Sequence, residues 1–139
     1  MRILTVLICK LLAFIGKCLN KGTSFPGAVA LKIRPEILSE LVLPENIIAV
    51  TGSNGKTSTV EMIAKIISDS NKTVVWNKEG SNQIEGIATL LIKNSTLSGR
   101  VKGDAVVMES DERYARYTFK YIKPTHFVIT NLYRDQLTR

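Results

Sequence analysis

The stretch Ala49-Val50-Thr51-Gly52-Ser53-Asn54-Gly55-Lys56-Thr57-Ser58 decides the fold of this chain of 139 residues. An apolar run, residues 47–50, precedes the glycines, and apolar residues at helical spacing follow them from Val60 to Ile67. A strand, a glycine loop, a Lys-Thr pair and a helix in this order are typical of a phosphate-binding loop. Because glycine lacks a Cβ atom, such a loop can turn tightly and direct its N–H groups toward an anion.

The candidate nucleotide-binding residues are those of the loop itself: Thr51, Gly52, Ser53, Asn54, Gly55, Lys56, Thr57 and Ser58. The Lys56 ammonium can reach the β- and γ-phosphates of ATP, and the Thr57 hydroxyl is placed to ligate Mg²⁺. The common spacing G-x-x-x-x-G-K-[ST] needs a glycine where this chain has Val50, so the loop is a T-G-x-N-G-K-T variant. A chance Gly-Lys-Thr in an ordinary strand–turn–helix is the alternative, but the flanking elements favour the loop.

Short apolar strands alternate with helices through the rest of the chain. We expect strands over residues 47–50, 72–76, 104–108 and 125–130, and helices over 57–70, 84–93 and 112–121. Strands separated by helices pair in parallel through right-handed crossovers, and continuous apolar strands indicate that both sheet faces are covered. The sequence therefore predicts an α/β fold with a parallel sheet of the P-loop NTPase type at 46–139, preceded by a helical segment at 1–45.

Polar residues follow two of these strands, at the edge of a parallel sheet where ligands bind. Glu109 comes directly after a buried strand, and we expect it to act with Lys56 in catalysis and with Thr57 in binding Mg²⁺. Asp111 and Glu112 are weaker candidates, since either can simply charge the start of the next helix. The base-reading N-K-x-D motif of GTPases is absent from the sequence, which argues against that class.

Asn131 follows the last strand and is predicted to bond the nucleotide or a metal-bound water. Arg134 and Asp135 lie just beyond it, and for them a structural ion pair is as good an interpretation as a direct role in the site. His126 lies inside the apolar pattern and is predicted to be a packed strand residue rather than a ligand.

The apolar run at residues 3–19 has helical spacing and contains Lys10 and Lys17 on one face. It is shorter than the roughly 20 residues that span a bilayer. We expect it to pack on the rest of the protein. Peripheral contact with a membrane, lysines outward, is the second interpretation, and a signal peptide is the third. Cys9 and Cys18 are half a helical turn out of phase, so buried free thiols are predicted rather than a disulfide or a metal pair.

The net charge of +7 is concentrated near the N-terminus, since residues 1–40 carry six Lys/Arg against two Glu. A solvated basic surface is one explanation, and attraction to anionic head groups or a pyrophosphate substrate is another. No basic–aromatic interleaving and no nucleic-acid reader motif is present, so no nucleic-acid partner is predicted.

The loop Thr51-Gly52-Ser53-Asn54-Gly55-Lys56-Thr57-Ser58 resembles the ATP loop of the Mur ligases, which join amino acids to peptidoglycan precursors through an acyl-phosphate. Folylpolyglutamate synthases share this loop. Further stretches resemble the MurT branch of the family: Gly22-Thr23-Ser24-Phe25-Pro26-Gly27, Ala30-Leu31-Lys32-Ile33, Gly80-Ser81-Asn82, Gly86-Ile87-Ala88-Thr89, Glu109-Ser110-Asp111-Glu112 and Thr130-Asn131-Leu132-Tyr133-Arg134-Asp135-Gln136-Leu137. Gln136 stands where many Mur ligases have histidine, as in MurT, whereas Thr138 departs from the usual aspartate.

The resemblance implies ATP and Mg²⁺ as cofactors, and lipid II as a substrate whose D-glutamate is amidated together with a GatD-like glutamine amidotransferase subunit. Reduced thiols beside a nucleotide loop suit the cytoplasm, with the inner face of the membrane as an alternative position. The family's zinc ribbon and C-terminal domain have no counterpart in these residues, so we expect an N-terminal portion that is inactive by itself. Another Mur-type amino-acid ligase, a folylpolyglutamate synthase-like enzyme and a noncatalytic nucleotide-binding fragment remain alternatives.

Overall fold

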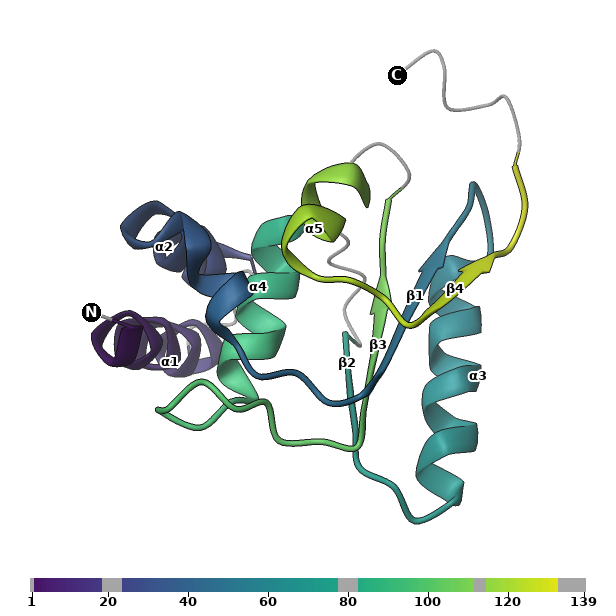
Figure 1. Ribbon diagram of the computed structural model, residues 1–139, viewed down its shortest axis with the longest axis horizontal. Helices are drawn as coiled ribbons and strands as arrows, with labels where there is room; N and C mark the ends of the chain where they lie inside the picture. Colours follow the sequence, from purple (N-terminus) through teal and green to yellow (C-terminus); the bar gives the residue numbers. More distant parts are fainter. Residues whose placement is uncertain (1, 19–23, 78–82, 112–114, 133–139) are drawn as a thin grey trace.

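The computed structural model describes residues 2–18, 24–77, 83–111 and 115–132 (Figure 1). Its elements in chain order are α1 (Arg2–Cys18), α2 (Phe25–Ile33), the 3₁₀ helix η1 (Pro35–Glu40), β1 (Asn46–Thr51), α3 (Lys56–Asp69), β2 (Val74–Trp76), α4 (Ile84–Lys93), β3 (Ala105–Glu109), α5 (Ala115–Tyr121) and β4 (His126–Ile129). The strands form one sheet in the order β2-β3-β1-β4, and every pairing is parallel. The predicted α/β class is therefore confirmed.

Helices cover the two faces of the sheet, as Figure 1 shows with α3 on one side and α4, α2 and α1 on the other. Alternation along the strands divides the side chains between two cores. Val106 and Met108 of β3 join the larger core with α4 and the N-terminal helices, whereas Val107 joins Val50 and Val60 in a smaller core under α3. The larger core also includes residues before position 45, so the N-terminal helices pack directly on the sheet unit.

Strand β2 begins two residues later than the sequence predicts, and β3 begins one residue later. The reason is a clamp before the two strands, in which the backbone N–H and the hydroxyl of Thr73 both donate to Asp104 Oδ2 at 2.8 Å. The Thr73 N–H thus bonds a side chain rather than a neighbouring strand, and the paired residues begin at Val74 and Ala105. The two hydrogen bonds also hold the pKa of Asp104 below its usual value.

The expectation that all strands are covered on both faces is wrong for β4. This strand pairs with β1 along one side, and Phe127 and Ile129 are about half exposed. The Phe119 ring of α5 packs edge-on against Phe127 at 5.4 Å, which covers only part of the strand. His126, predicted to be packed, is exposed, and its Nδ1 lies 3.0 Å from the Thr125 hydroxyl.

Helix α1 packs on the rest of the protein, as predicted. Val6 and Cys9 are buried, and burial raises the pKa of the Cys9 thiol to about 11. Lys10 points inward rather than outward, and its Nζ donates to the Lys93 and Ser95 carbonyls at 3.0 and 2.5 Å. This lysine satisfies carbonyl groups at the C-terminal end of α4, which a helix leaves without partners. The side chain of Cys18 lies outside the described residues.

Candidate nucleotide-binding site

The glycine loop, residues 51–58, joins the end of β1 to the first turn of α3. Gly52 and Gly55 have positive φ angles of 131° and 79°, which side-chain-bearing residues rarely adopt. Gly52 is required for a second reason, since a Cβ atom there would lie 2.7 Å from the backbone oxygen of Asn131. Gly55 has open space around it and is the residue before the first turn of α3. The loop therefore needs both glycines, for different reasons.

Lys56 is buried, and its ammonium folds back over the glycine loop. Its Nζ donates to the carbonyl of Gly52 at 2.6 Å and to that of Ser53 at 3.2 Å. These contacts place a positive charge at the N-terminal end of α3, where a helix presents unpaired N–H groups and a positive dipole end. An anion at this position would meet the lysine, the loop backbone and the helix together.

Thr57 and Glu109 meet across the site, as the sequence predicts for two Mg²⁺ ligands. The Thr57 hydroxyl donates to Glu109 Oε2 at 2.8 Å, although the residues are 52 positions apart. Glu109 is 5% exposed and is the last residue of β3, which ends one residue later than predicted. Its backbone N–H donates to Asn77 Oδ1 at 3.3 Å, so the strand that carries it is held from the β2 side as well.

The residues at this edge fit a magnesium ion shared with phosphate. Mg²⁺ prefers hard oxygen ligands and commonly keeps one or two carboxylates, with waters and phosphate oxygens completing its shell. Glu109 and Thr57 offer a carboxylate and a hydroxyl within hydrogen-bond distance of each other. No group of three or more His, Cys, Asp or Glu able to hold a metal occurs in the described part of the chain. Thr57 and Glu109 are the two oxygen-bearing side chains that would contribute to the shell of a phosphate-bound ion.

Asn131, which lies just after β4, forms hydrogen bonds with the glycine loop. Its Oδ1 accepts from the Asn54 backbone N–H at 3.0 Å, and its Nδ2 donates to the Asn54 carbonyl at 3.0 Å. Its own carbonyl accepts from the Ser53 N–H at 3.2 Å. The Thr130 hydroxyl also lies 2.7 Å from the Asn54 carbonyl. We call Thr130 and Asn131 the loop latch, because together they fix the peptide units around Asn54.

The other predicted site residues are less closely tied to this centre. Ser58 is exposed on the first turn of α3, and Asp111 is half-buried beyond β3. Glu112, Arg134 and Asp135 lie outside the described residues. Sequence reasoning assigned no role to Thr130 or Asn77. The available signal was a polar residue at the carboxyl end of a predicted strand, since Thr130 is the last residue of one and Asn77 directly follows another.

Two buried hydroxyls at the same edge have no hydrogen-bond partner in the described part of the chain, Thr51 Oγ1 and Ser110 Oγ. Thr51 is the last residue of β1, and Ser110 follows the neighbouring strand β3, where its N–H donates to the Val50 carbonyl at 2.9 Å. An unpaired buried hydroxyl costs free energy. The edge thus keeps polar groups that a bound ligand or water could satisfy.

A parallel sheet with an inner strand that leads into a glycine loop and a helix is typical of α/β proteins that bind phosphate. Residues 50–138 match the family model described as "Mur ligase middle domain". This match covers more than half of the chain, and the chain belongs to the Mur ligase family.

Curated relatives place the chain near one branch of this family. It is 37% identical over 126 residues to "Lipid II isoglutaminyl synthase (glutamine-hydrolyzing) subunit MurT" of Streptococcus pneumoniae, covering 91% of this chain and 28% of that protein. The subunit of the same name from Staphylococcus aureus strain COL is 33% identical, with 86% and 27% covered. A UDP-N-acetylmuramate–L-alanine ligase of Pelagibacter ubique is 36% identical over 104 residues, with 75% and 20% covered.

Among solved structures, MurF of Acinetobacter baumannii matches with a TM-score of 0.50 and 25% identity, covering 76% of this chain and 22% of MurF. The chain spans only about a quarter of the length of the MurT relatives. No helix among the described residues is long and apolar enough to cross a membrane.

Proposed function

We propose that this chain forms the ATP-binding part of a MurT-like amide ligase, which amidates the D-glutamate of lipid II in the cytoplasm. The observation that carries the proposal is the pairing of Thr57 with Glu109 beside the buried Lys56 in the glycine loop. The MurT relatives, which carry the name of a lipid II isoglutaminyl synthase subunit, support the choice of reaction.

The proposed reaction begins with phosphoryl transfer from ATP to the substrate carboxylate. A carboxylate oxygen forms a bond to the γ-phosphorus as the bond to ADP breaks, which gives an acyl-phosphate. Lys56 and the N–H groups of the loop stabilise the charge on the transferring phosphoryl group. Glu109 and Thr57 would hold Mg²⁺, which neutralises phosphate charge when bound. The loop latch holds the backbone around Asn54 in place, because Asn131 bonds both the N–H and the carbonyl of that residue.

Ammonia then attacks the acyl carbon, loses a proton, and expels phosphate to leave the amide. We propose that this ammonia comes from a GatD-like glutamine amidotransferase subunit. The MurT relatives support a partner as the source, because their name describes a subunit of a glutamine-hydrolyzing synthase. The chain alone is expected to form no amide.

Calorimetry of Mg–ATP binding tests the nucleotide site. Lys56→Ala should weaken binding by about 1.5–3 kcal/mol, the contribution of a charge-assisted hydrogen bond, and so by at least about tenfold. Lys65→Ala is the matched control, because Lys65 is exposed on the same helix and its loss changes the net charge equally. Equal affinity for the Lys56 variant and the wild type would overturn the assignment.

Addition of an amino acid instead of ammonia is the second candidate reaction, favoured by the match to UDP-N-acetylmuramate–L-alanine ligases. The two reactions share the acyl-phosphate and differ in the nucleophile. Mass spectrometry of the product of the whole enzyme separates them. Amidation slightly lowers the mass of the precursor, whereas ligation raises it by an amino-acid residue. A residue-sized gain, with no amidation under supplied ammonia, would favour the second reaction.

A further inference from the structure

One face of α1 carries large apolar side chains that remain exposed in the described structure. Six of them are between 43% and 67% exposed: Ile3, Leu4, Leu7, Leu11, Phe14 and Ile15. We call them the outer face of α1. They recur at three- and four-residue spacing, which puts them on one side of a helix of 17 residues, about 25 Å long. A continuous apolar strip of this size marks an interaction surface on a soluble domain.

The opposite face of α1 fixes how this surface is presented. Val6 and Cys9 are buried in the core, and Lys10 is bonded to the end of α4. At the start of the helix, Arg2 Nη1 lies 3.4 Å from the Glu40 carbonyl. Because these contacts hold the inner face, α1 cannot bury its outer face by rotating in place. The outer face is therefore available to a partner while the helix stays docked.

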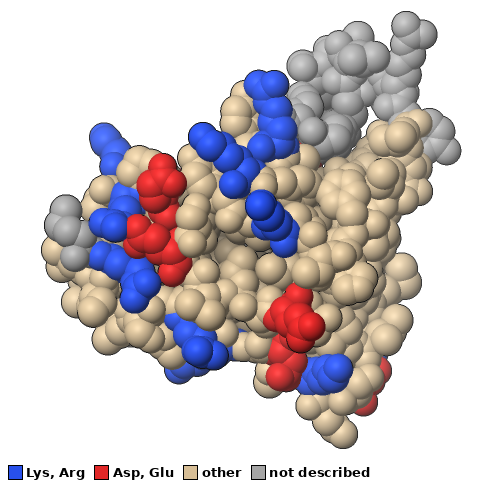
Figure 2. All heavy atoms as spheres, viewed as in Figure 1, with Lys and Arg blue, Asp and Glu red and all other residues tan. Residues whose placement is uncertain are grey.

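Charge indicates what kind of partner fits. Residues 1–40 contain six Lys/Arg and two Glu, and Glu40 forms an ion pair with Arg34 at 2.6 Å. Lys17 and Lys32 are exposed on α1 and α2. Figure 2 shows basic side chains along the side of the molecule where these helices lie, and the carboxylates visible there belong to neither helix. An apolar strip bordered by cations, on a helix too short to span a bilayer, is the pattern of helices that lie in a membrane interface.

We propose that the outer face of α1 docks on an anionic lipid membrane. The apolar side chains enter the boundary between head groups and acyl chains, and the exposed lysines contact the head groups. This inference uses the proposed function only to identify the membrane as the one that carries the lipid-linked substrate. It otherwise stands on residues that are remote from the glycine loop. The lysines sit differently from the sequence expectation, since Lys10 anchors the helix from inside.

Vesicle sedimentation tests the proposal, with phosphatidylcholine vesicles that contain or lack phosphatidylglycerol. The chain should bind the anionic vesicles, bind the neutral ones much less, and dissociate as salt is raised. The variant Leu11→Glu/Phe14→Glu should lose at least about tenfold in binding, because two large apolar groups no longer enter the membrane. Absence of wild-type binding, or equal binding to both kinds of vesicle, would overturn the proposal.

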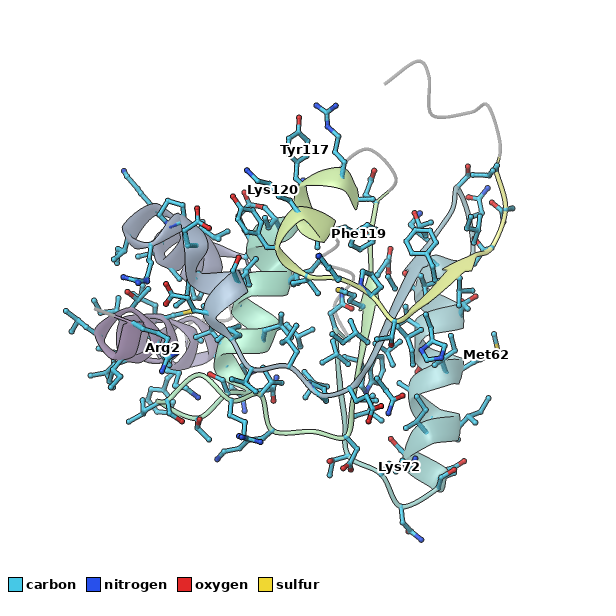
Figure 3. The ribbon with its side chains drawn as sticks, viewed as in Figure 1. Arg2, Met62, Lys72, Tyr117, Phe119 and Lys120 are labelled. Atoms are coloured by element: carbon cyan, nitrogen blue, oxygen red, sulfur yellow. The ribbon has the colours of Figure 1, made fainter. Side chains whose placement is uncertain are left out.

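Met62→Glu/Ile66→Glu is the matched control on α3, across the sheet from α1 (Figure 3). Met62 and Ile66 are 57% and 67% exposed, against 58% and 67% for Leu11 and Phe14. Both variants change the net charge equally, so a difference between them reports the location of the apolar surface. An equal loss of binding in both variants would show that the change in net charge alone causes the loss. That result would refute the assignment to α1.

Two further measurements separate the other outcomes. Sedimentation velocity without lipid reports self-association, and a dimer abolished by Leu11→Glu/Phe14→Glu, with no vesicle binding, would make the outer face a self-interface instead. Calorimetry with Mg–ATP on the same variant should give the wild-type affinity. Failure of vesicle binding with normal ATP binding would overturn this inference and leave the proposed function standing.

Discussion

Replacing Gly52 by alanine should damage the protein far more than the same change at Gly55. The backbone of Gly52 has φ 131°, and forcing a side-chain-bearing residue there costs about 1–3 kcal/mol. The new Cβ would also lie 2.7 Å from the Asn131 oxygen and 3.0 Å from its nitrogen. Since both atoms are backbone, the end of β4 must move. Each latch hydrogen bond lost in that movement costs about 0.5–1.5 kcal/mol more.

At Gly55 the same substitution meets only the first of these penalties. No atom lies within 4 Å of the position a Cβ would occupy, and φ is 79°. A left-handed conformation costs a non-glycine residue about 1–2 kcal/mol. Both variants gain the same offset from a less flexible unfolded chain. Gly52→Ala should therefore lose about 1–4 kcal/mol more unfolding free energy than Gly55→Ala.

Urea unfolding followed by circular dichroism measures this difference. The slope of the free energy of unfolding against urea should be unchanged in both variants, so that the midpoints report stability. Mg–ATP titration should show a larger loss for Gly52→Ala, because the displaced latch no longer fixes the Asn54 peptide. A larger loss of stability in Gly55→Ala, or no loss in Gly52→Ala, would show that Gly52 does not lie this close to the Asn131 backbone in solution.

Three further outcomes follow from single contacts. Asn131→Ala removes both side-chain bonds to Asn54 and should lower unfolding stability by about 1–3 kcal/mol, measured by urea unfolding; no change would mean the latch is not formed in solution. Glu109→Gln should keep the fold but lose the Mg²⁺-dependent part of ATP binding, measured by calorimetry with and without the metal; an unchanged metal dependence would move the role to Asp111. Hydrogen bonds from Thr73 lower the folded-state pKa of Asp104, so its contribution is present above the unfolded pKa and lost as pH falls through the folded one. Asp104→Asn should flatten the acid side of the stability–pH curve, and an unaltered acid slope would contradict this linkage.

The sequence was sufficient for the elements around the glycine loop because local signals agree there. Glycines, a lysine, a hydroxyl residue and helical apolar spacing all specify the same turn and helix. It was also sufficient to place Glu109 near Thr57, since carboxyl ends of parallel strands share an edge. Coverage of β4 was not predictable, because apolar composition describes a strand and not the neighbours that it meets. The orientation of α1 could not be predicted from the sequence for a similar reason.

Helix α1 is apolar on both sides, so hydrophobic spacing alone does not decide which face is buried. By side-chain size, Leu4, Leu7 and Leu11 form the larger apolar stripe. The structure instead buries the smaller side chains of Thr5, Val6 and Cys9 against the other helices. Small residues allow closer approach between helices, and Lys10 reaches acceptors only in this orientation. The orientation of α1 thus depends on the carbonyl groups at the end of α4, which Lys10 meets only in the folded protein.

The alternation of side chains along β3 determines both the packing of the core and the geometry of the site. Val106 and Met108 face the larger core, and Val107 faces α3, so Glu109 falls on the α3 side by alternation. Helix α3 begins on that side, and the Thr57 hydroxyl lies 2.8 Å from Glu109 Oε2. A slip of one residue in the pairing with β1 would place Glu109 on the opposite face and expose the apolar set together. The buried alternation that stabilises the sheet therefore also fixes which carboxylate meets the glycine loop.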